Sequence, residues 1–512
     1  MKTIAIYLPQ FHEVEENNQW WGKGFTDWIT VKNAHPLYTE HRQPRVPLNK
    51  NYYNLLDHDI MKWQAELAKT HKVSGFCFYH YWFKDGKKIL ERPAENLLKW
   101  KDIDMPFCFS WANQTWARTW TNFSNRNAWT GADFEKGKEG EKDDGILLRQ
   151  SYGGKREWKE HFDYLLPFFK DSRYIQYDGK PVFLIYKPEF MFCLDNMMEY
   201  WKELAVENGL NGICVITVRN NSRQWSQADY WLMQELDYSF MPRVNRKEDE
   251  VWQIEYKDAW EDVLKRAYAD GDDNIFYGGF IDVDDTPRRG NRGVSIKDAS
   301  PAIFEKYYKK LAELAAVKNR DLIFVNAWNE WGEGAYLEPD EDFKYGYLEA
   351  VKRVMDYIDQ TDAAYLQLDV KYIDLPEKGT TLIDERIYRK KEKYYHLLNK
   401  WVENREKNKK IDQVLVSMQI KNIAIYGMGD FGKHLVKELE NSMVNIQLCF
   451  DKTTDFLYME NPSKYIQNHY VDLDAVIVTP FLEYKEIRLF LKDYFSVPII
   501  SLEELISECE IL

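Results

Sequence analysis

Short apolar runs alternate with longer amphipathic stretches over the first 350 or so residues, and this alternation restricts the fold more than any other feature. Eight runs have the length and composition of buried β-strands, and each is followed by polar or aromatic residues. The predicted strands are Thr3–Leu8, Gly75–Tyr79, Pro106–Ser110, Pro181–Tyr186, Gly212–Val218, Tyr238–Pro242, Ile275–Ile281 and Leu322–Val325. The clearest predicted helices between them are Ile60–Thr70, Glu157–Lys170, Met197–Asn208 and Ala302–Val317.

Strands that alternate with helices imply right-handed crossovers and a parallel sheet. Eight such units predict an α/β fold of the (β/α)₈ TIM-barrel type over residues 1–360, with the active site at the C-terminal ends of the strands. An open doubly wound sheet is the alternative. That alternative would not place a polar cluster after every strand, so the barrel is favoured.

Residues 361–417 have a different character from the barrel. From Ile383 to Val414 the chain is dense in charge and nearly free of glycine and proline. Such a pattern predicts a solvated helical connector rather than a binding site.

A small Rossmann-like domain is predicted over residues 418–512. A strand at Ile423–Tyr426 leads into a Gly-x-Gly-x-x-Gly loop and a helix, and a second strand at Ile446–Phe450 ends at an aspartate. These glycines and the acid are Gly427, Gly429, Gly432 and Asp451. Their order and context match a dinucleotide-binding fingerprint.

Two interpretations of this loop stay open. It could bind a nucleotide or a nucleotide sugar through the three glycines and Asp451. It could equally belong to a structural or assembly module that retains the tight turn, because the predicted strands amount to half of a doubly wound domain. No catalytic residue accompanies the loop, which slightly favours the structural interpretation.

The stretch from Asp321 to Asp340, DLIFVNAWNEWGEGAYLEPD, carries the strongest indication of chemistry. A buried strand turns abruptly into a loop with three carboxylates, Glu330, Glu333 and Glu338, interleaved with aromatic residues. Paired acids beside aromatic rings suit sugar chemistry, because one acid can stay protonated while its neighbour is ionised. A surface loop with solvated acids is the plain alternative. The position directly after a strand favours Glu330 and Glu333 as catalytic residues.

Other residues at the ends of the predicted strands are candidates for substrate contact. They are Tyr7, Gln10, His12, His80, Tyr81, Trp82, Trp111, Asn113, Tyr186, Trp328, Asn329 and Trp331. Each alone is more often structural, but a tryptophan such as Trp82 can form a stacking platform for a sugar. Asp284, Asp285 and Arg288 are expected to form a salt-bridged brace. No spacing of ligands suggests a metal, and we expect no cofactor in the barrel.

Bulk composition narrows the partners and the compartment. The net charge of −14 argues against nucleic acid as a general ligand, and an aromatic content of 16% fits a cleft that stacks sugars. The six cysteines lack metal or CxxC spacing, which favours a reducing compartment. Neither a signal peptide nor a membrane-length apolar segment is visible. We therefore expect a soluble, cytoplasmic protein; the oligomeric state is not indicated.

Several long motifs resemble a known family. IAIYLPQFHEVEENNQWWGKGFTDWITVKNAHPLY, GFCFYHYWF and FCFSWANQTWARTW resemble the WbsX-type proteins of bacterial polysaccharide loci. WNEWGEGAYLEPD resembles the same group and also the Asn-Glu-Trp-x-Glu-Gly signature of glycoside hydrolase family 99, the endo-α-mannosidases. The resemblance covers residues 1–360 and implies a (β/α)₈ barrel.

The resemblance also implies roles for the two glutamates. Glu330 would act as a base on the 2-hydroxyl of the substrate, giving a 1,2-anhydro sugar, and Glu333 would be the general acid and base at the glycosidic oxygen. This route is a substrate-assisted exception to the usual retaining pair. The signature usually has histidine where this chain has Gly332, so the sugar specificity stays open.

Three hypotheses for function follow. The leading one is an enzyme acting on glycosidic bonds of a bacterial surface polysaccharide (O-antigen or capsule) or its precursor. The second is a glycosyltransferase of lipopolysaccharide or capsule biosynthesis that uses a nucleotide sugar, although Asp282-x-Asp284 is its only candidate metal-diphosphate motif. The third is a non-catalytic glycan-binding protein, disfavoured because stacking alone would not need paired glutamates. The expected partner in each case is an oligo- or polysaccharide.

Overall fold

The structure is a computed structural model that describes residues 1–117, 146–219, 224–236, 250–361, 397–450 and 472–509, apart from isolated positions within these ranges. The chain divides into two compact units, Met1–Glu377 and Lys378–Leu512. Each unit is described by itself below.

The first unit is built on a closed barrel of eight parallel strands, which confirms the predicted fold. Its strands are β1 (Lys2–Tyr7), β2 (Val73–His80), β3 (Phe107–Trp111), β7 (Lys180–Ile185), β8 (Cys214–Val218), β9 (Tyr230–Met233), β11 (Ile275–Phe280) and β13 (Leu322–Asn326). Each strand pairs with the next, and the first pairs with the last through Ile4 and Phe324. Parallel pairing places all the C-terminal strand ends at one mouth.

The sixth strand differs from the prediction. It is β9, at Tyr230–Met233, where Trp231 pairs with Thr217 on one side and Ile275 on the other. The predicted segment Tyr238–Pro242 lies outside the described residues. Both segments are short runs of aromatic and apolar residues, so periodicity alone does not choose between them. The proline at the end of the predicted run was a signal against it.

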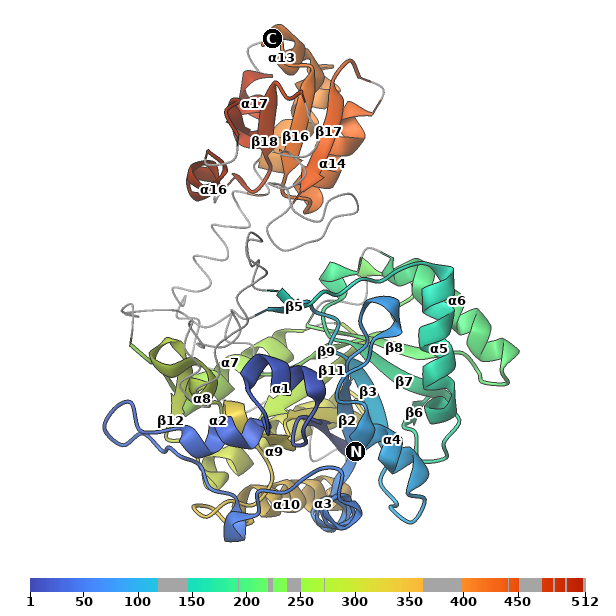
Figure 1. Cartoon of the computed structure of the whole chain (residues 1–512), viewed down its shortest axis with the longest axis vertical. Helices are drawn as coiled ribbons and strands as arrows, with labels where there is room; N and C mark the ends of the chain where they lie inside the picture. Colours follow the sequence, from blue (N-terminus) through green and yellow to red (C-terminus); the bar gives the residue numbers. More distant parts are fainter. Residues whose placement is uncertain are drawn as a thin grey trace. The chain divides into compact units, whose positions relative to one another are not determined.

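Helices surround the barrel strands (Figure 1). They are α3 (His58–Thr70), α4 (Arg92–Lys99), α5 (Lys155–Phe169), α6 (Leu194–Glu207), α7 (Tyr256–Ala269), α9 (Pro301–Val317) and α10 (Gly346–Gln360). Their buried positions recur every three or four residues, as Phe304, Tyr308 and Leu311 do in α9. The strands and these helix faces form one continuous hydrophobic core.

Shorter helices and strands lie in the segments that connect the barrel strands to these helices. They are α1 (Glu15–Trp21), α2 (Asp27–Asn33), α8 (Thr286–Arg289), β4 (Trp116–Ala117), β5 (Ile146–Leu148), β6 (Gln176–Tyr177), β10 (Trp252–Glu255), β12 (Val294–Lys297), β14 (Asn329–Glu330) and β15 (Ala335–Tyr336). The antiparallel pair β14 and β15 follows the last barrel strand directly. This hairpin and the helices α2 and α8 carry the candidate site.

The second unit has a four-stranded parallel sheet in the order β17-β16-β18-β19. Its elements are α13 (Ile411–Ser417), β16 (Asn422–Tyr426), α14 (Asp430–Leu439), β17 (Asn445–Phe450), β18 (Ala475–Val478), α16 (Tyr484–Leu491), β19 (Ile499–Ser501) and α17 (Leu502–Glu508). In chain order this is 2-1-3-4, the flavodoxin-like doubly wound order. Leu397 and Trp401 join its core, so part of the charged stretch packs into this unit instead of standing in solvent.

Within the described ranges of the chain, no helix is long and apolar enough to cross a membrane.

Candidate active site

The two glutamates lie on a hairpin at the C-terminal mouth of the barrel. After β13 the chain continues beside β1, where the amide of Trp328 donates to the carbonyl of Ile6 at 2.7 Å. The strand pair β14–β15 then encloses a 3₁₀ turn at Trp331–Glu333, which ends at Gly334 with a φ of 65°. Only glycine adopts that conformation readily, so this turn fixes where Glu330 and Glu333 lie.

One guanidinium, that of Arg288 on α8, holds three carboxylates. Its Nη2 lies 3.0 Å from Oδ2 of Asp27 and 3.2 Å from Oε2 of Glu330, and its Nη1 donates to Oε1 of Glu333 at 2.6 Å. The Asp27 and Glu330 side chains are 3% and 7% exposed, whereas Glu333 is 41% exposed. Glu333 is therefore the acid that an incoming ligand meets first.

Three carboxylates around one cation leave an excess of negative charge. Burial raises the pKa of Glu330 to about 8, and the charge of Glu333 adds to the shift while Arg288 opposes it. A buried carboxyl next to another carboxylate takes up a proton because both cannot ionise cheaply. At neutral pH the pair therefore carries one proton, which Glu330 holds in this structure.

Inward-facing residues of the barrel complete the surroundings. Burial raises the pKa values of Tyr79 and Tyr81, and the nearby charges of Glu330 and Glu333 contribute. The hydroxyl of Tyr79 accepts a hydrogen bond from Nε2 of Gln234 at 3.2 Å. The neutral hydroxyls of Tyr79 and Tyr81 thus lie close to both acids.

Four residues of this site were absent from the predicted set. They are Asp27, Tyr79, Gln234 and Arg288. Tyr79 could have been found from its spacing, because residues two apart on a strand share a face and Tyr81 was already a candidate. Asp27 lies within the quoted N-terminal motif. Gln234 had no available signal, since the strand before it was misplaced.

The expected brace of Asp284, Asp285 and Arg288 does not form. Oδ2 of Asp284 instead lies 2.9 Å from Nε2 of His41, and Asp285 pairs with Arg289 at 3.2 Å. Sequence proximity suggested the brace, but the short helix α8 directs Arg288 toward the hairpin. The amide of Asp284 does donate to the carbonyl of Glu333 at 2.6 Å, which ties this segment to the turn.

The predicted stacking residues of the hairpin are buried and bind the third acid. The carboxylate of Glu338 accepts hydrogen bonds from the indole N–H groups of Trp328 and Trp331 at 3.0 and 2.7 Å. Tyr53 and Gln64 donate to it at 2.7 and 2.6 Å. Burial raises the pKa of Glu338 to about 7 although all four hydrogen bonds oppose the shift. This network supports the hairpin from beneath.

Two further candidates belong to the same support. The Tyr7 hydroxyl donates to Oε1 of Gln64 at 2.7 Å, and Tyr7 is fully buried. Asn329 is also fully buried and bonds the amide and carbonyl of Leu8 at 2.7 and 3.0 Å. In this structure both residues attach the hairpin to the barrel and neither reaches the open side of the site.

A separate group of candidates faces the helix layer. Nε2 of His80 lies 2.7 Å from Nε2 of His161 on α5. The Trp82 ring stacks on the same histidine with centroids 4.4 Å apart, and the Trp111 indole donates to the carbonyl of Trp82 at 3.1 Å. Side chains alternate at the end of β2 and in the two residues after it, so Tyr79 and Tyr81 lie near the glutamates while His80 and Trp82 contact His161 on α5.

The remaining barrel candidates are dispersed. Asn113 is buried and links two loops through the amide and carbonyl of Lys187 at 2.8 and 2.9 Å. His12 is buried, and burial lowers its pKa to about 4.

Gln10 is half-buried, and its carbonyl accepts from the amide of Asp27 at 3.4 Å. Tyr186 is half-buried and meets the Tyr79 ring at 5.8 Å, which places it beside the site.

Gly332 has a tight environment that explains its identity. A Cβ atom on this residue would lie 2.6 Å from Oδ2 of Asp27 and 2.7 Å from Nε of Arg288. Both distances are shorter than a nonbonded contact allows. The Arg288–Asp27 pair therefore occupies the space into which any side chain at this position would point.

The glycine loop of the second unit is explained in part by packing. A Cβ on Gly427 would lie 2.3 Å from Pro480, and one on Gly432 would lie 2.1 Å from the carbonyl of Gly427. A Cβ on Gly429 would meet nothing within 4 Å. Packing thus requires the first and third glycines, whereas the second leaves open space at the start of α14. Asp451 lies outside the described residues.

Within the described parts of the chain, no group of three or more histidine, cysteine, aspartate and glutamate side chains is arranged to hold a metal ion.

A closed barrel of eight parallel strands with helices around it defines a class, that of the (β/α)₈-barrel proteins. The chain belongs to the family described as Glycosyltransferase WbsX, which matches residues 3–351. Membership of this family is what the N-terminal motifs predicted.

Curated relatives and solved structures also resemble the chain. The uncharacterized protein WxcX of two strains of Xanthomonas campestris pv. campestris is 29% identical over 365 residues, which is 69% of this chain and 49% of theirs. The chain thus spans about half the length of these relatives. The GH99 endo-alpha-mannosidase from Bacteroides thetaiotaomicron aligns with a TM-score of 0.42 and 14% identity, covering 70% of this chain and 97% of that one. A family 5 xyloglucanase from Paenibacillus pabuli aligns with a TM-score of 0.35 and 8% identity, covering 70% and 98%.

Proposed function

We propose that this chain cleaves or rearranges glycosidic bonds of a bacterial surface polysaccharide, such as O-antigen or capsule, or of its precursor. Glu330 and Glu333 carry the chemistry with retention of configuration. The observation that carries the proposal is that Glu330 and Glu333 share one proton at neutral pH, which we call the one-proton pair. Arg288 holds the two acids together at the barrel mouth, and the pKa of Glu330 is raised to about 8. General acid and base catalysis needs such a divided pair with a pKa near the working pH.

The reaction uses the 2-hydroxyl of the sugar as its internal nucleophile. Glu330 accepts the proton of that hydroxyl while O2 attacks C1, and the bond between C1 and the leaving oxygen breaks as Glu333 donates a proton to it. Water then attacks C1 of the 1,2-anhydro sugar and gives a proton to Glu333. At the same time O2 takes back from Glu330 the proton that it lost in the first step. Two inversions at C1 give net retention.

The proton must move from Glu330 to Glu333 before the first step. Both arrangements have the same total charge, so the pair titrates as a unit and the shift requires no proton from solvent. A sugar seated over the half-exposed Glu333 removes water from its carboxylate and so favours its protonated form. Arg288 touches both acids and stays as their counter-charge throughout.

Substitution of each acid tests the roles. Glu333→Gln should lower turnover of a natural glycan by about 10²–10⁴-fold, the usual contribution of general acid–base catalysis. An aryl glycoside with a good leaving group should partly rescue this variant because its departing oxygen needs no proton. Glu330→Gln should not be rescued, and a 2-deoxy substrate should be inert with the unmodified enzyme. Near-normal turnover in both variants would contradict the mechanism.

Transfer from a nucleotide sugar is the second candidate function. The description of the family as glycosyltransferases and the open glycine loop of the second unit favour it. Purified full-length chain should be incubated with acceptor glycans, with and without nucleotide sugars. Product that forms only when a nucleotide sugar is present would replace the hydrolytic proposal with this one.

A further inference from the structure

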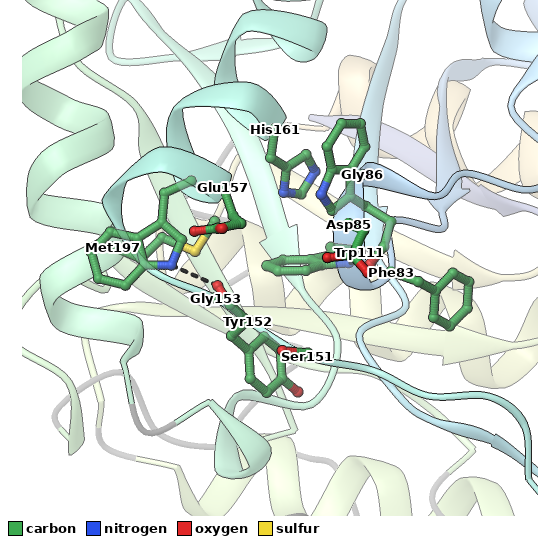
Figure 2. Close-up of a pocket in the computed structure, with 12 residues that line it drawn as sticks. Phe83, Asp85, Gly86, Trp111, Ser151, Tyr152, Gly153, Glu157, His161 and Met197 are labelled. Atoms are coloured by element: carbon green, nitrogen blue, oxygen red, sulfur yellow. Dashed lines mark hydrogen bonds between the residues drawn. The ribbon is translucent and has the colours of Figure 1, made fainter. Parts of the chain in front are cut away.

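A cavity of about 180 Å³ lies between the barrel wall and helices α5 and α6, apart from the two glutamates. Three tryptophans contribute to its lining, namely Trp82, Trp111 and Trp158. Figure 2 shows that its residues come from the loop after β2, the end of β3, the segment before α5, and the two helices. The cavity therefore uses the helix-facing side of the strands, whereas the glutamate pair uses the mouth.

The polar lining of the cavity includes an imidazole nitrogen without a partner. His161 is 1% exposed, and its Nε2 lies 2.7 Å from Nε2 of His80. Its Nδ1 is buried and has no hydrogen-bond partner. A buried polar atom of this kind is costly unless a ligand or water satisfies it. Burial lowers the pKa of His161 well below its usual range, so the ring is neutral.

The charges around the cavity exclude an anionic ligand. Its described lining residues include the carboxylates of Asp85 and Glu157 and neither a lysine nor an arginine. Phosphate and diphosphate groups are bound in proteins by cations or arrays of N–H donors. Glu157 is a ready acceptor: it takes the amide of Gly154 at 3.0 Å and Arg156 at 2.8 Å, and it is still 33% exposed.

Flat indoles combined with hydrogen-bond acceptors suit a hydroxyl-rich ring. The volume is below the roughly 300–1,000 Å³ of ordinary ligand pockets, so a single ring fits and an oligosaccharide does not. We propose that this cavity is a second carbohydrate site, which holds one neutral pyranose unit of the same glycan on which Glu330 and Glu333 act. The identity of that glycan rests on the proposed function above.

Proximity along the strand end links the two sites. Tyr81 lies beside the glutamates and its neighbour Trp82 lines the cavity. A glycan held at the cavity by one sugar would keep its other sugars at a high local concentration near the barrel mouth, which raises affinity for a chain without new contacts at the acids.

The test measures binding of methyl glycosides to the full-length chain. Methyl glycosides of mannose, glucose and galactose would be titrated by saturation-transfer NMR, with tryptophan fluorescence as a second readout. Ser151 lines the cavity in a non-helical segment, so Ser151→Trp should fill it and weaken binding at least tenfold. Ser172→Trp is the matched control, because Ser172 is exposed and outside the cavity. Ser151→Ala keeps the cavity and should bind normally.

Binding should persist in the Glu333→Gln chain, which separates this site from the reaction. Loss of binding in Glu333→Gln but not in Ser151→Trp would overturn the proposal, as would no binding up to about 100 mM glycoside. Displacement of the glycoside by tetramethylammonium would show a cation site instead. If glycosides bind at the cavity and no glycan is ever cleaved, the proposed function fails while this site stands.

Discussion

Glu330, Glu333 and Glu338 lie within nine residues of one another, yet their surroundings give them different tasks. Glu338 is enclosed by four donors and leaves no lone pair for a substrate. Glu330 is buried with Arg288 as its cation, and Glu333 is open to solvent. The sequence could identify the pair, because Glu-x-x-Glu followed a buried strand. It could not show that the indoles of Trp328 and Trp331 donate to Glu338, since that depends on packing.

A pH profile tests the one-proton pair. The reaction needs one proton on the pair, and the pKa of Glu330, raised to about 8, marks where that proton is lost. We expect kcat/KM to fall above about pH 8, approaching tenfold per pH unit. The measurement is kcat/KM for a soluble oligosaccharide from pH 5 to pH 10. With an aryl glycoside the alkaline fall should be weaker, since its leaving oxygen needs no proton; an equal fall would contradict this assignment.

At the scale of elements, the end of β2 shows that a sequence pattern can locate a strand without showing which side chains face the site. The aromatic run after Gly75 identified a strand end rich in potential sugar contacts, and the structure confirms the strand. However, its side chains alternate between the two sides of the barrel wall. Tyr79 and Tyr81 face the acids, whereas His80 and Trp82 face α5. A run made mostly of aromatic residues conceals this alternation, because apolar and polar residues do not alternate along it.

Two tyrosines on opposite sides of the barrel wall provide a matched test. Tyr79→Phe removes a hydroxyl beside Glu330 and Glu333, so kcat/KM should fall about tenfold with little change in stability. Tyr7→Phe removes a hydroxyl that donates to Gln64 in the buried network, so the free energy of unfolding should fall by about 1 kcal/mol with turnover unchanged. Urea denaturation and steady-state kinetics on both variants check this. Reversed effects would place Tyr7, not Tyr79, at the site.

Substitutions in the glycine loop after β16 can distinguish a role in packing from a role in ligand binding. A valine side chain at Gly429 meets no neighbour within 4 Å at its Cβ, so Gly429→Val should fold normally. If the loop holds a nucleotide phosphate at the start of α14, the same variant should lose nucleotide binding in calorimetry. Gly432→Ala should instead destabilise the second unit, because its Cβ would lie 2.1 Å from a carbonyl oxygen.

The unmodified chain should also be tested with nucleotides and nucleotide sugars at millimolar concentration. If it binds none of them, the loop has a structural role and not a ligand-binding one. Asp430 opens α14 and puts a negative charge where a phosphate would sit, which favours that outcome. The strand order 2-1-3-4 was not available from the sequence, because the glycine spacing is compatible with both doubly wound orders.

For the whole molecule, each compact unit has hydrophobic core clusters of its own. The sequence indicated a change in character after residue 360 from the charge-dense run between Ile383 and Val414. It did not indicate that Leu397 and Trp401 belong to the second core, because a helix with few buried residues resembles a solvated one. The number of strands in the barrel was predictable from alternation, and the polar cluster after each strand favoured a closed barrel over an open sheet.

Separate cores predict separable units. A chain ending at Glu377 should fold, keep kcat for a simple aryl glycoside within about twofold, and show one of the unfolding transitions of the full chain. Differential scanning calorimetry of the full chain and of the shortened one provides the comparison. Loss of folding or of turnover in the shortened chain would mean that the second unit is required by the barrel.

Gly332 and the Arg288–Asp27 pair are linked by their close packing. The mannosidase-type signature carries histidine at the position of Gly332, and here any such side chain would collide with the Arg288–Asp27 pair. Histidine at this position would therefore shift the ends of the Arg288 and Asp27 side chains, which would disturb the ion pairs of Arg288 with Glu330 and Glu333. The effect of a substitution at position 332 thus depends on which residues stand at positions 27 and 288.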